Sequence, residues 1–347
     1  MATPRTRAES LILKAITNLP DPVMRAATPN KDKAGLKLSA ESQMLLRAIE
    51  LVGVPPLVDP PTPHSRQEWN QKARMVGGKQ HVGAFHDLEV PGAEGMLPAR
   101  IYTPTSRLSQ HQIPTMMFFH GGGMAQGSID SHDPTCRFLA ERSGVQIISV
   151  GYRLAPEHKF PAGVEDCFAA FQWLTDSVTA VAADPERLVV GGDSAGGHFA
   201  ATTAIQAAEH GLALRHQLLI YPATDFVNKS QSRHTFSDGY YLDDESIERY
   251  KSWYFKDSSQ WGDPLASVAL RDSFPAGLAP ATVITAGFDP LRDEGKAYAD
   301  LLKAKGMTVE FEQFDDMLHG FINMIGLGYQ PQVHVGRIAR MLTAAVA

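Results

Sequence analysis

Three polar residues that could carry out nucleophilic chemistry each follow a separate apolar segment of this chain. Ser194 lies in the segment Gly-Asp-Ser-Ala-Gly-Gly, Asp289 in Gly-Phe-Asp-Pro, and His319 in Leu-His-Gly-Phe. A serine hydroxyl becomes a strong nucleophile when a histidine takes its proton and a carboxylate orients that histidine. These three residue types predict a nucleophile, a base and an orienting acid, provided that the fold brings them together.

The serine is expected to sit in a tight turn between a strand over 188–191 and a helix over 198–210. Side chains at Gly192 and Gly196 would collide with neighbouring backbone there, so the glycines permit the turn. We expect a strained backbone at Ser194, which lifts the hydroxyl clear of the sheet. Asp193 is expected to hold the turn by local hydrogen bonds.

The acid is the member of the triad with competitors, since Asp293 and Glu294 lie nearby in the sequence. Both fall inside a helix predicted over 293–305, whereas Asp289 directly follows the strand predicted over 281–286. Asp289 is therefore the preferred acid. The order serine, aspartate, histidine along the chain is the order of α/β hydrolases.

A run of three glycines follows another apolar strand, predicted over 114–119, and supplies electrostatic help for acyl transfer. The tetrahedral intermediate of that reaction carries an oxyanion, and losing one preorganised donor raises the barrier by roughly 2.7–4 kcal/mol. We expect the amides of Gly122, Gly123 and Ala195 to be the donors. His120 and Gly121 are expected to support the loop, His120 by hydrogen bonds and not as a second base.

Apolar strands alternate with helices through most of the chain, which predicts a mainly parallel sheet covered on both faces. Reactive groups gather beyond the carboxyl ends of the strands in such sheets. The expected strands cover 99–104, 114–119, 145–151, 188–191, 217–221, 281–286 and 308–314. The expected helices cover 36–52, 133–143, 164–177, 198–210, 293–305 and 331–346.

The texture divides the chain into four parts. Residues 1–85 are expected to form N-terminal cap helices and a lead-in without strands. The catalytic core is expected to consist of two parts, residues 86–222 and residues 276–347. Residues 223–275 are rich in aromatics and interrupt the alternation. We interpret them as an inserted helical cap over a pocket, with a large helical surface loop as the alternative.

Composition excludes several other classes of protein. The 347 residues are 44% hydrophobic and carry a formal charge of −6 with no basic stripe, so nucleic acid is not an expected partner. No metal-binding, dinucleotide or Walker motif occurs, and neither a metal nor a cofactor is expected. No apolar run reaches the roughly 18 residues that span a membrane. The presence of only two cysteines suits a reducing compartment, so a cytoplasmic location is expected. An amphipathic helix is expected over 7–18. A secreted form whose leader peptide has been cleaved is the alternative.

Taken together, the motifs of residues 85–330 resemble the hormone-sensitive-lipase family of esterases, the bacterial family IV type. The match rests on His-Gly-Gly-Gly at 120–123, Gly-Asp-Ser-Ala-Gly-Gly at 192–197, Asp-Pro-Leu-Arg-Asp-Glu at 289–294 and His-Gly-Phe at 319–321. Tyr-Arg-Leu-Ala-Pro-Glu at 152–157, Phe-Pro-Ala at 160–162 and the following Asp166 also match.

The resemblance implies an α/β-hydrolase core of eight strands, a helical cap, and hydrolysis of small carboxylic esters with short to medium acyl chains, without a cofactor. It also implies a homodimer through the edge strand at 308–314. One residue departs from the family, since Met124 stands where an aromatic is common, and we expect it to shape the acyl pocket. Glu157 and Asp166 are expected to pair with Arg153 or to cap backbone amides.

Two other functions remain open at this stage. A lipase or amidase could use the same triad, and the sequence discriminates weakly among these substrates. A ligand-binding protein on the same fold is disfavoured because His319 is present, whereas receptors that resemble this family lose the catalytic histidine.

Overall fold

An eight-stranded sheet forms the centre of the protein. The computed structural model describes residues 12–52 and 59–347. The strand order is β1-β2-β4-β3-β5-β6-β7-β8. The pairs β1–β2 and β2–β4 are antiparallel, and the remaining pairs, from β4 to β8, are parallel. The strands are β1 (Ala84–Gly92), β2 (Gly95–Thr103), β3 (Ile113–Phe119), β4 (Gln146–Val150), β5 (Ala183–Asp193), β6 (His216–Ile220), β7 (Ala281–Phe288) and β8 (Val309–Leu318).

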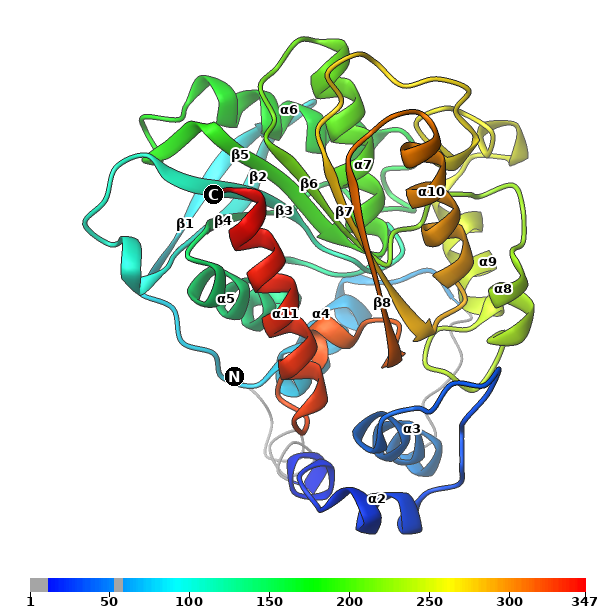
Figure 1. Cartoon of the computed structure of the whole chain (residues 1–347). Helices are drawn as coiled ribbons and strands as arrows, with labels where there is room; N and C mark the ends of the chain where they lie inside the picture. The colour runs from blue at the N-terminus through cyan, green and yellow to red at the C-terminus, as the bar shows by residue number, and fades with distance from the viewer. Residues whose placement is uncertain (1–11, 53–58) are drawn as a thin grey trace.

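Helices cover both faces of this sheet (Figure 1). They are α2 (Asp21–Ala27), α3 (Ala40–Val52), α4 (Pro63–Gly77), α5 (Ile129–Ser143), α6 (Ala162–Asp176), α7 (Ala195–Glu209), α8 (Gln231–Thr235), α9 (Asp244–Tyr254), α10 (Arg292–Ala304) and α11 (Gln330–Ala345). Short 3-10 turns lie at Thr105–Arg107, Ser258–Gln260, Val268–Leu270 and Phe321–Met324. Residues 12–17 are also helical.

Strand composition explains the two covered faces. Every residue of β3, β4, β6 and β7 is buried, so side chains pointing to either face leave water. Alternate residues of β3 belong to different cores: Met117 belongs to the cluster that includes residues of α6, α7 and α10, whereas Met116 belongs to the cluster that includes residues of α5 and α11. This division is the physical signature of a parallel sheet sandwiched between helices.

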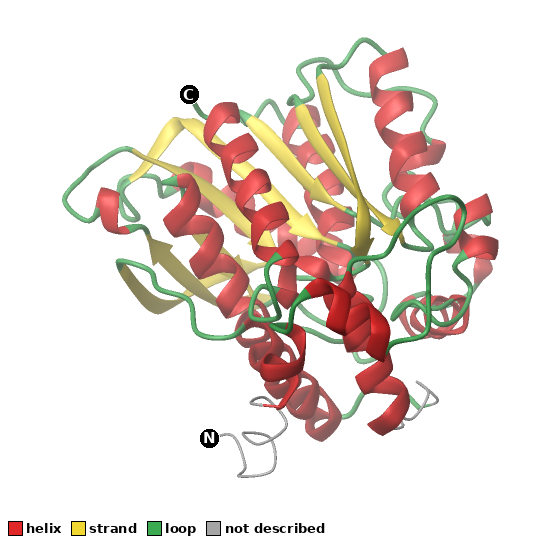
Figure 2. Cartoon of the chain, turned by 60° about the horizontal axis from the view of Figure 1, so that its bottom comes forward, coloured by secondary structure: helices red, strands yellow, loops and turns green. Residues whose placement is uncertain are grey.

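The N-terminal segment and the inserted segment pack on each other near the ends of β7 and β8. Leu38 and Leu46 share a buried cluster with Phe236 and Tyr240 from the insertion and with Phe288 and Leu318 from the strand ends. Figure 2 shows these cap helices brought forward below the sheet. The packing accords with the expectation that the two segments combine, while the domain boundaries stay a prediction.

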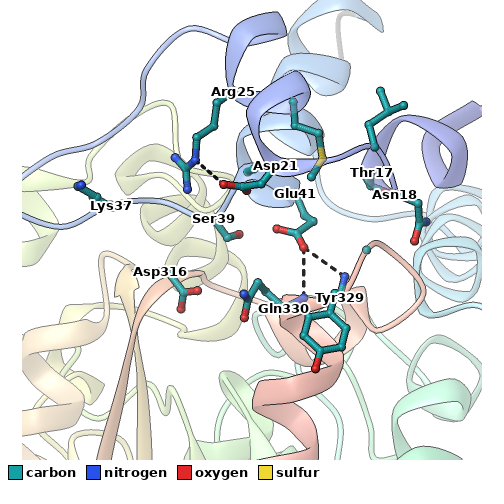
Figure 3. A pocket seen from close by; sticks show the side chains of 14 residues that line it. Thr17, Asn18, Asp21, Arg25, Lys37, Ser39, Glu41, Asp316, Tyr329 and Gln330 are labelled. Carbon is teal, nitrogen blue, oxygen red and sulfur yellow. Dashed lines mark hydrogen bonds and ion pairs between the residues drawn. The ribbon is translucent and has the colours of Figure 1, made fainter.

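Glu41 of α3 fastens the N-terminal helices to the start of α11. Its Oε1 accepts the amides of Tyr329 and Gln330, both at 3.2 Å. The amides at the start of a helix have no partner within the helix, and the helix dipole is positive at that end. A carboxylate at this position is therefore stabilised. A cavity of about 380 Å³ lies beside this contact, between α2, α3 and the start of α11 (Figure 3).

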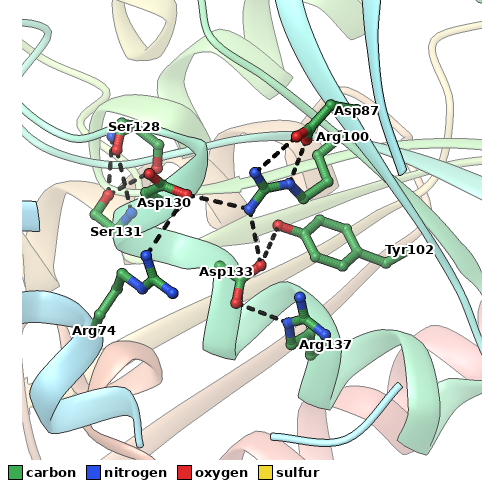
Figure 4. A network of polar contacts seen from close by, with 9 residues as sticks. All are labelled: Arg74, Asp87, Arg100, Tyr102, Ser128, Asp130, Ser131, Asp133 and Arg137. Carbon is green, nitrogen blue, oxygen red and sulfur yellow. Dashed lines mark hydrogen bonds and ion pairs between the residues drawn. The ribbon is translucent and has the colours of Figure 1, made fainter. Parts of the chain in front are cut away.

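A second polar network ties the antiparallel strands to α5 (Figure 4). Arg100 of β2 donates to its cross-strand partner Asp87 at 2.5 Å and to Asp130 and Asp133 at 3.2 and 3.1 Å. Asp130 and Asp133 lie in the first turns of α5, where carboxylates are favoured. The network fixes the start of α5, which directly follows the glycine-rich loop.

Each strand expected from the sequence is present, although the bounds differ by several residues at β2, β5 and β8. Outside the inserted segment, three elements were not predicted individually, namely β1, α2 and α4. Strand β1 is an edge strand whose residues are mostly exposed, so it lacks the apolar run that marks the central strands. Helices α2 and α4 lie within residues 1–85, for which the sequence predicted cap helices without giving bounds for these two. The helix expected over 7–18 lies partly outside the described residues.

Candidate active site

The turn that carries Ser194 has the strained geometry expected from its glycines. Ser194 has φ 56° and ψ −119°, a backbone region that residues other than glycine rarely adopt. A Cβ at Gly196 would overlap the backbone of Phe119, and one at Gly192 would overlap Gly196 itself. The turn therefore leaves no room for side chains at either position, and it raises the serine between β5 and α7.

Ser194, His319 and Asp289 form one continuous chain of hydrogen bonds. The Ser194 Oγ lies 2.9 Å from His319 Nε2, and His319 Nδ1 lies 2.7 Å from Asp289 Oδ2. A carboxylate only accepts, so Nδ1 carries the proton and Nε2 is free to accept from the hydroxyl. Asp289 is fully buried, and its Oδ1 accepts the Leu291 amide at 2.8 Å. Asp293 instead accepts the amide of Ser232, away from His319.

The glycine-rich loop lies next to the serine turn and offers unpaired amides. Gly122 and Gly123 have φ of 126° and 59°, which glycine adopts without strain. In the described part of the chain neither amide donates to an acceptor, and the same holds for Ala195 at the start of α7. The three residues expected to hold an oxyanion thus present donors that the protein leaves free.

Asp193 joins the glycine-rich loop to the serine turn. Its Oδ1 accepts the Gly121 amide at 2.8 Å and lies 3.0 Å from His132 Nε2. These partners are remote in sequence, so the expectation of local hydrogen bonds is wrong. Burial alone would raise the pKa of Asp193, but His132 and the Gly121 amide outweigh burial and hold that pKa below its ordinary value. The carboxylate is therefore a charged anchor beneath the loop.

His120 is buried under the same loop and stacks on Tyr152, with ring centroids 4.3 Å apart. Its Nδ1 lies 2.9 Å from the Gly121 carbonyl, and the Tyr152 hydroxyl donates to the His120 carbonyl at 2.5 Å. Burial, with a smaller contribution from His132, lowers the pKa of His120 to about 3. The ring is thus neutral near pH 7 and supports the loop through hydrogen bonds.

Two cap tyrosines lie against glycines that flank the site. A Cβ at Gly123 would overlap the Tyr250 ring, so that ring from α9 covers the loop directly. The Tyr241 Cε1 would be 3.2 Å from a Cβ at Gly320, which follows His319. Two residues of the aromatic insertion therefore border the candidate site, whereas the role of 223–275 as a cap over a pocket stays a prediction.

Other predicted residues have different surroundings. Met124 is 3% exposed, belongs to the main core and has φ 59°. Its role in an acyl pocket stays a prediction. Asp166 accepts from Arg153 at 2.8 Å, as expected, whereas Glu157 pairs with Arg66 and not with Arg153.

Sequence reasoning missed Arg66, His132 and Tyr250 as residues of this region. Nothing in the local sequence marks them, because the contacts that bring them here join Arg66 to Ala125, His132 to Asp193 and Tyr250 to Gly123, pairs that are far apart along the chain. Within residues 12–52 and 59–347, no group of three or more His, Cys, Asp or Glu could hold a metal ion. Over the same residues, no helix is long and apolar enough to cross a membrane.

The family model for the alpha/beta hydrolase fold matches residues 116–323, more than half of the chain. The chain belongs to the hormone-sensitive-lipase family of α/β hydrolases. Among relatives of this hydrolase is the carboxylic ester hydrolase LipN of Mycobacterium tuberculosis, 36% identical over 91% of this chain and 86% of that protein. Another is the ethyl acetate hydrolase of Pseudomonas putida, 35% identical over 75% of this chain and 83% of its own length.

Solved structures agree with this assignment. An α/β hydrolase from the metagenome of Lake Arreo superimposes on this hydrolase with a TM-score of 0.85 and 35% identity, over 88% of this chain and 98% of that one. The esterase of Pyrobaculum calidifontis gives 0.81 and 34%, over 88% and 99%. The protein is an ester hydrolase with the α/β-hydrolase fold.

Proposed function

We propose that Ser194 is the nucleophile of this ester hydrolase, with His319 as general base and Asp289 as its orienting acid. The observation that carries the proposal is the chain of hydrogen bonds at 2.9 and 2.7 Å that ends at a hydroxyl in a strained turn. His319 takes the hydroxyl proton as Oγ attacks the ester carbonyl, and it then protonates the leaving alcohol oxygen. His319 then takes a proton from water as the water attacks the acyl-enzyme, and the carboxylic acid and the free Ser194 hydroxyl are released.

The negative charge of each tetrahedral intermediate falls on the former carbonyl oxygen. We assign its stabilisation to the amides of Gly122, Gly123 and Ala195. Their lack of acceptors in the described residues supports this role, since a donor already paired inside the protein would have to exchange partners during the reaction. Asp193 and His120 act indirectly, because they hold the loop and touch no reacting atom.

Substitution of the nucleophile tests the mechanism. Ser194→Ala should lower kcat for p-nitrophenyl butyrate on the order of a millionfold, the size of effect seen when a triad nucleophile is removed. Asp293→Asn, which removes a charge outside the triad, is the matched control and should stay near wild type. A fluorophosphonate should label the wild type at Ser194 and leave Ser194→Ala unlabelled. Full turnover by Ser194→Ala would refute the mechanism, and no labelling of the wild type would count against Ser194 as a reactive nucleophile.

Small esters with short to medium acyl chains are the proposed substrates. The rings of Tyr250 and Tyr241 lie against Gly123 and Gly320, and we expect them to limit the length of acyl chain that the site accepts. A relative named for hydrolysis of ethyl acetate points the same way. A series of p-nitrophenyl esters from acetate to palmitate tests this, and a maximum at the long chains would indicate a lipase. Parallel assays with p-nitroanilides test the amidase alternative.

Association through the sheet edge is the proposed assembly. Strand β8 is the last of the order, and among the described residues it pairs only with β7. An edge strand offers unpaired donors and acceptors to a second copy, so we propose a homodimer through 308–314. Light scattering should give twice the chain mass, and a monomer mass at all micromolar concentrations would contradict it.

A cytoplasmic location is proposed on the state of the cysteines. Cys136 and Cys167 are both free and buried, which suits a reducing compartment. Fractionation of the producing cells should recover the activity with cytoplasmic markers.

A further inference from the structure

Arg66 of α4 connects the N-terminal helices to the two loops under the candidate site. Its Nε donates to the Ala125 carbonyl at 2.8 Å, and one terminal nitrogen donates to the Ala155 carbonyl at 2.7 Å. The two terminal nitrogens also bind the Glu157 carboxylate at 2.9 and 2.7 Å. The side chain is only 16% exposed. A guanidinium is suited to this task because its donors form a rigid planar fork.

The loop that Arg66 contacts needs outside support. Four of its residues have positive φ, namely Gly122, Gly123, Met124 and Gly127. Glycines gain freedom on unfolding, and a methionine at φ 59° is strained, so the loop's own backbone preferences do not fix this conformation. The Ala155 amide donates to the Met124 carbonyl at 2.9 Å and joins the loop to the segment that follows β4. Arg66 holds the carbonyls on both sides of that junction.

The contact with Ala125 also begins a chain of peptide groups that ends at a free amide. The peptide whose carbonyl Arg66 binds carries the N–H of Gln126, and this N–H donates to the Gly122 carbonyl at 2.8 Å. The peptide of that carbonyl carries the N–H of Gly123. Hydrogen bonds in series polarise one another, so a cation at one end makes the donor at the other end stronger.

We propose that Arg66 is a positioning residue of the oxyanion hole, which fixes the loop and polarises the Gly123 amide through two peptide groups. The proposal rests on the proposed function, since it takes Gly123 as an oxyanion donor. It adds a residue from the N-terminal helices to the machinery of the reaction. Arg66 touches no reacting atom, and its effect should appear only when negative charge develops on the bound oxygen.

A tetrahedral inhibitor separates this role from ordinary structural support. The variants are Arg66→Met, Arg66→Lys and, as the matched control on the same helix, Arg74→Met. Arg74 is 54% exposed and reaches a carboxylate only at 4.0 Å. For each variant, kcat and KM are measured with p-nitrophenyl butyrate, and Ki with butylboronic acid, which forms a tetrahedral adduct with a reactive serine. Urea unfolding identifies conditions in which each variant is fully folded.

The proposal predicts a parallel loss in kcat and in boronate affinity at nearly constant KM. Loss of a whole donor costs roughly 10²–10³-fold in kcat, so a donor that is weakened and displaced should lose about tenfold in Arg66→Met. Arg66→Lys keeps the charge but not the fork, and it should fall between Arg66→Met and wild type. Arg74→Met should match wild type in all three constants. Arg66→Lys carries the test if Arg66→Met does not fold.

Glu157→Gln distinguishes the carbonyl contacts from the ion pair. Glu157 is 47% exposed, and an ion pair so accessible to water contributes little, so its loss should change Ki by no more than about twofold. The proposal is overturned if folded Arg66→Met and Arg66→Lys keep wild-type kcat and Ki, or if Glu157→Gln reproduces the whole loss. Ser194→Ala separates this outcome from failure of the mechanism, because it alone should abolish both turnover and boronate binding.

Discussion

Replacement of Ser194 by alanine and by glycine should give two variants that differ in stability but share the same loss of activity. Ser194 has φ 56° and ψ −119°, and a side chain in such a region raises the free energy of the folded state by about 1–3 kcal/mol. Ser194→Ala keeps a Cβ and therefore keeps this strain. Ser194→Gly removes the Cβ and relieves it, at the expense of about 0.5–1 kcal/mol for the more flexible unfolded chain. Both variants lack the hydroxyl.

The balance of these two terms favours the glycine variant. Ser194→Gly should be more stable than Ser194→Ala by about 0.5–2 kcal/mol. With a urea m value of about 3 kcal/mol/M, the midpoint should lie about 0.2–0.7 M higher for the glycine variant. Equilibrium urea unfolding, followed by tryptophan fluorescence, measures the difference directly.

An ordinary helix position provides the control. Ala297 is exposed in the middle of α10, where a change from alanine to glycine should lower stability by about 1 kcal/mol. Glycine in place of alanine should therefore raise the free energy of unfolding at position 194 and lower it at position 297. If Ser194→Gly is less stable than Ser194→Ala by about the amount found for Ala297→Gly, the turn stores no strain and the argument is refuted.

Three further predictions concern the acid, the serine turn and a buried carboxyl. Asp289→Asn should lower kcat by about 10⁴-fold, because the amide favours the wrong tautomer of the histidine, and activity near wild type in steady-state assays would assign the acid elsewhere. Gly196→Ala should abolish folding or activity, since its Cβ would overlap backbone of β3, whereas Gly262→Ala has open space and should be neutral; a stable, active Gly196→Ala enzyme would contradict the geometry. Burial raises the pKa of Glu294 to about 8, above its unfolded value, so the folded state holds the proton more tightly and stability should fall as pH rises from about 4.5 to about 8. Glu294→Gln should flatten that fall in urea midpoints measured between pH 5 and 8.5, and an unchanged slope would show that this carboxyl is not its source.

The sequence by itself determined the fold class and the members of the candidate triad. The signals were local: glycines at 192 and 196 permit a tight turn around Ser194, the three glycines at 121–123 follow an apolar strand, and Asp289 follows another strand. Because parallel strands end at one edge of a sheet, motifs placed just after strands converge without further information. That convergence is why Ser194 and His319, 125 positions apart, could be paired from the sequence.

Only the tertiary structure decided what holds these groups in place. Asp193 was expected to bond locally, yet it accepts from Gly121 and lies beside His132. Arg66 contacts carbonyls 59 and 89 positions away. Such partners depend on how helices and loops pack, and no spacing rule connects residues on different elements. The exposed strand β1 escaped prediction for a related reason, since its place is set by pairing with β2 and not by an apolar pattern of its own. The reacting groups can thus be identified from short sequence motifs, whereas the contacts that hold those groups in position exist only after the chain has folded.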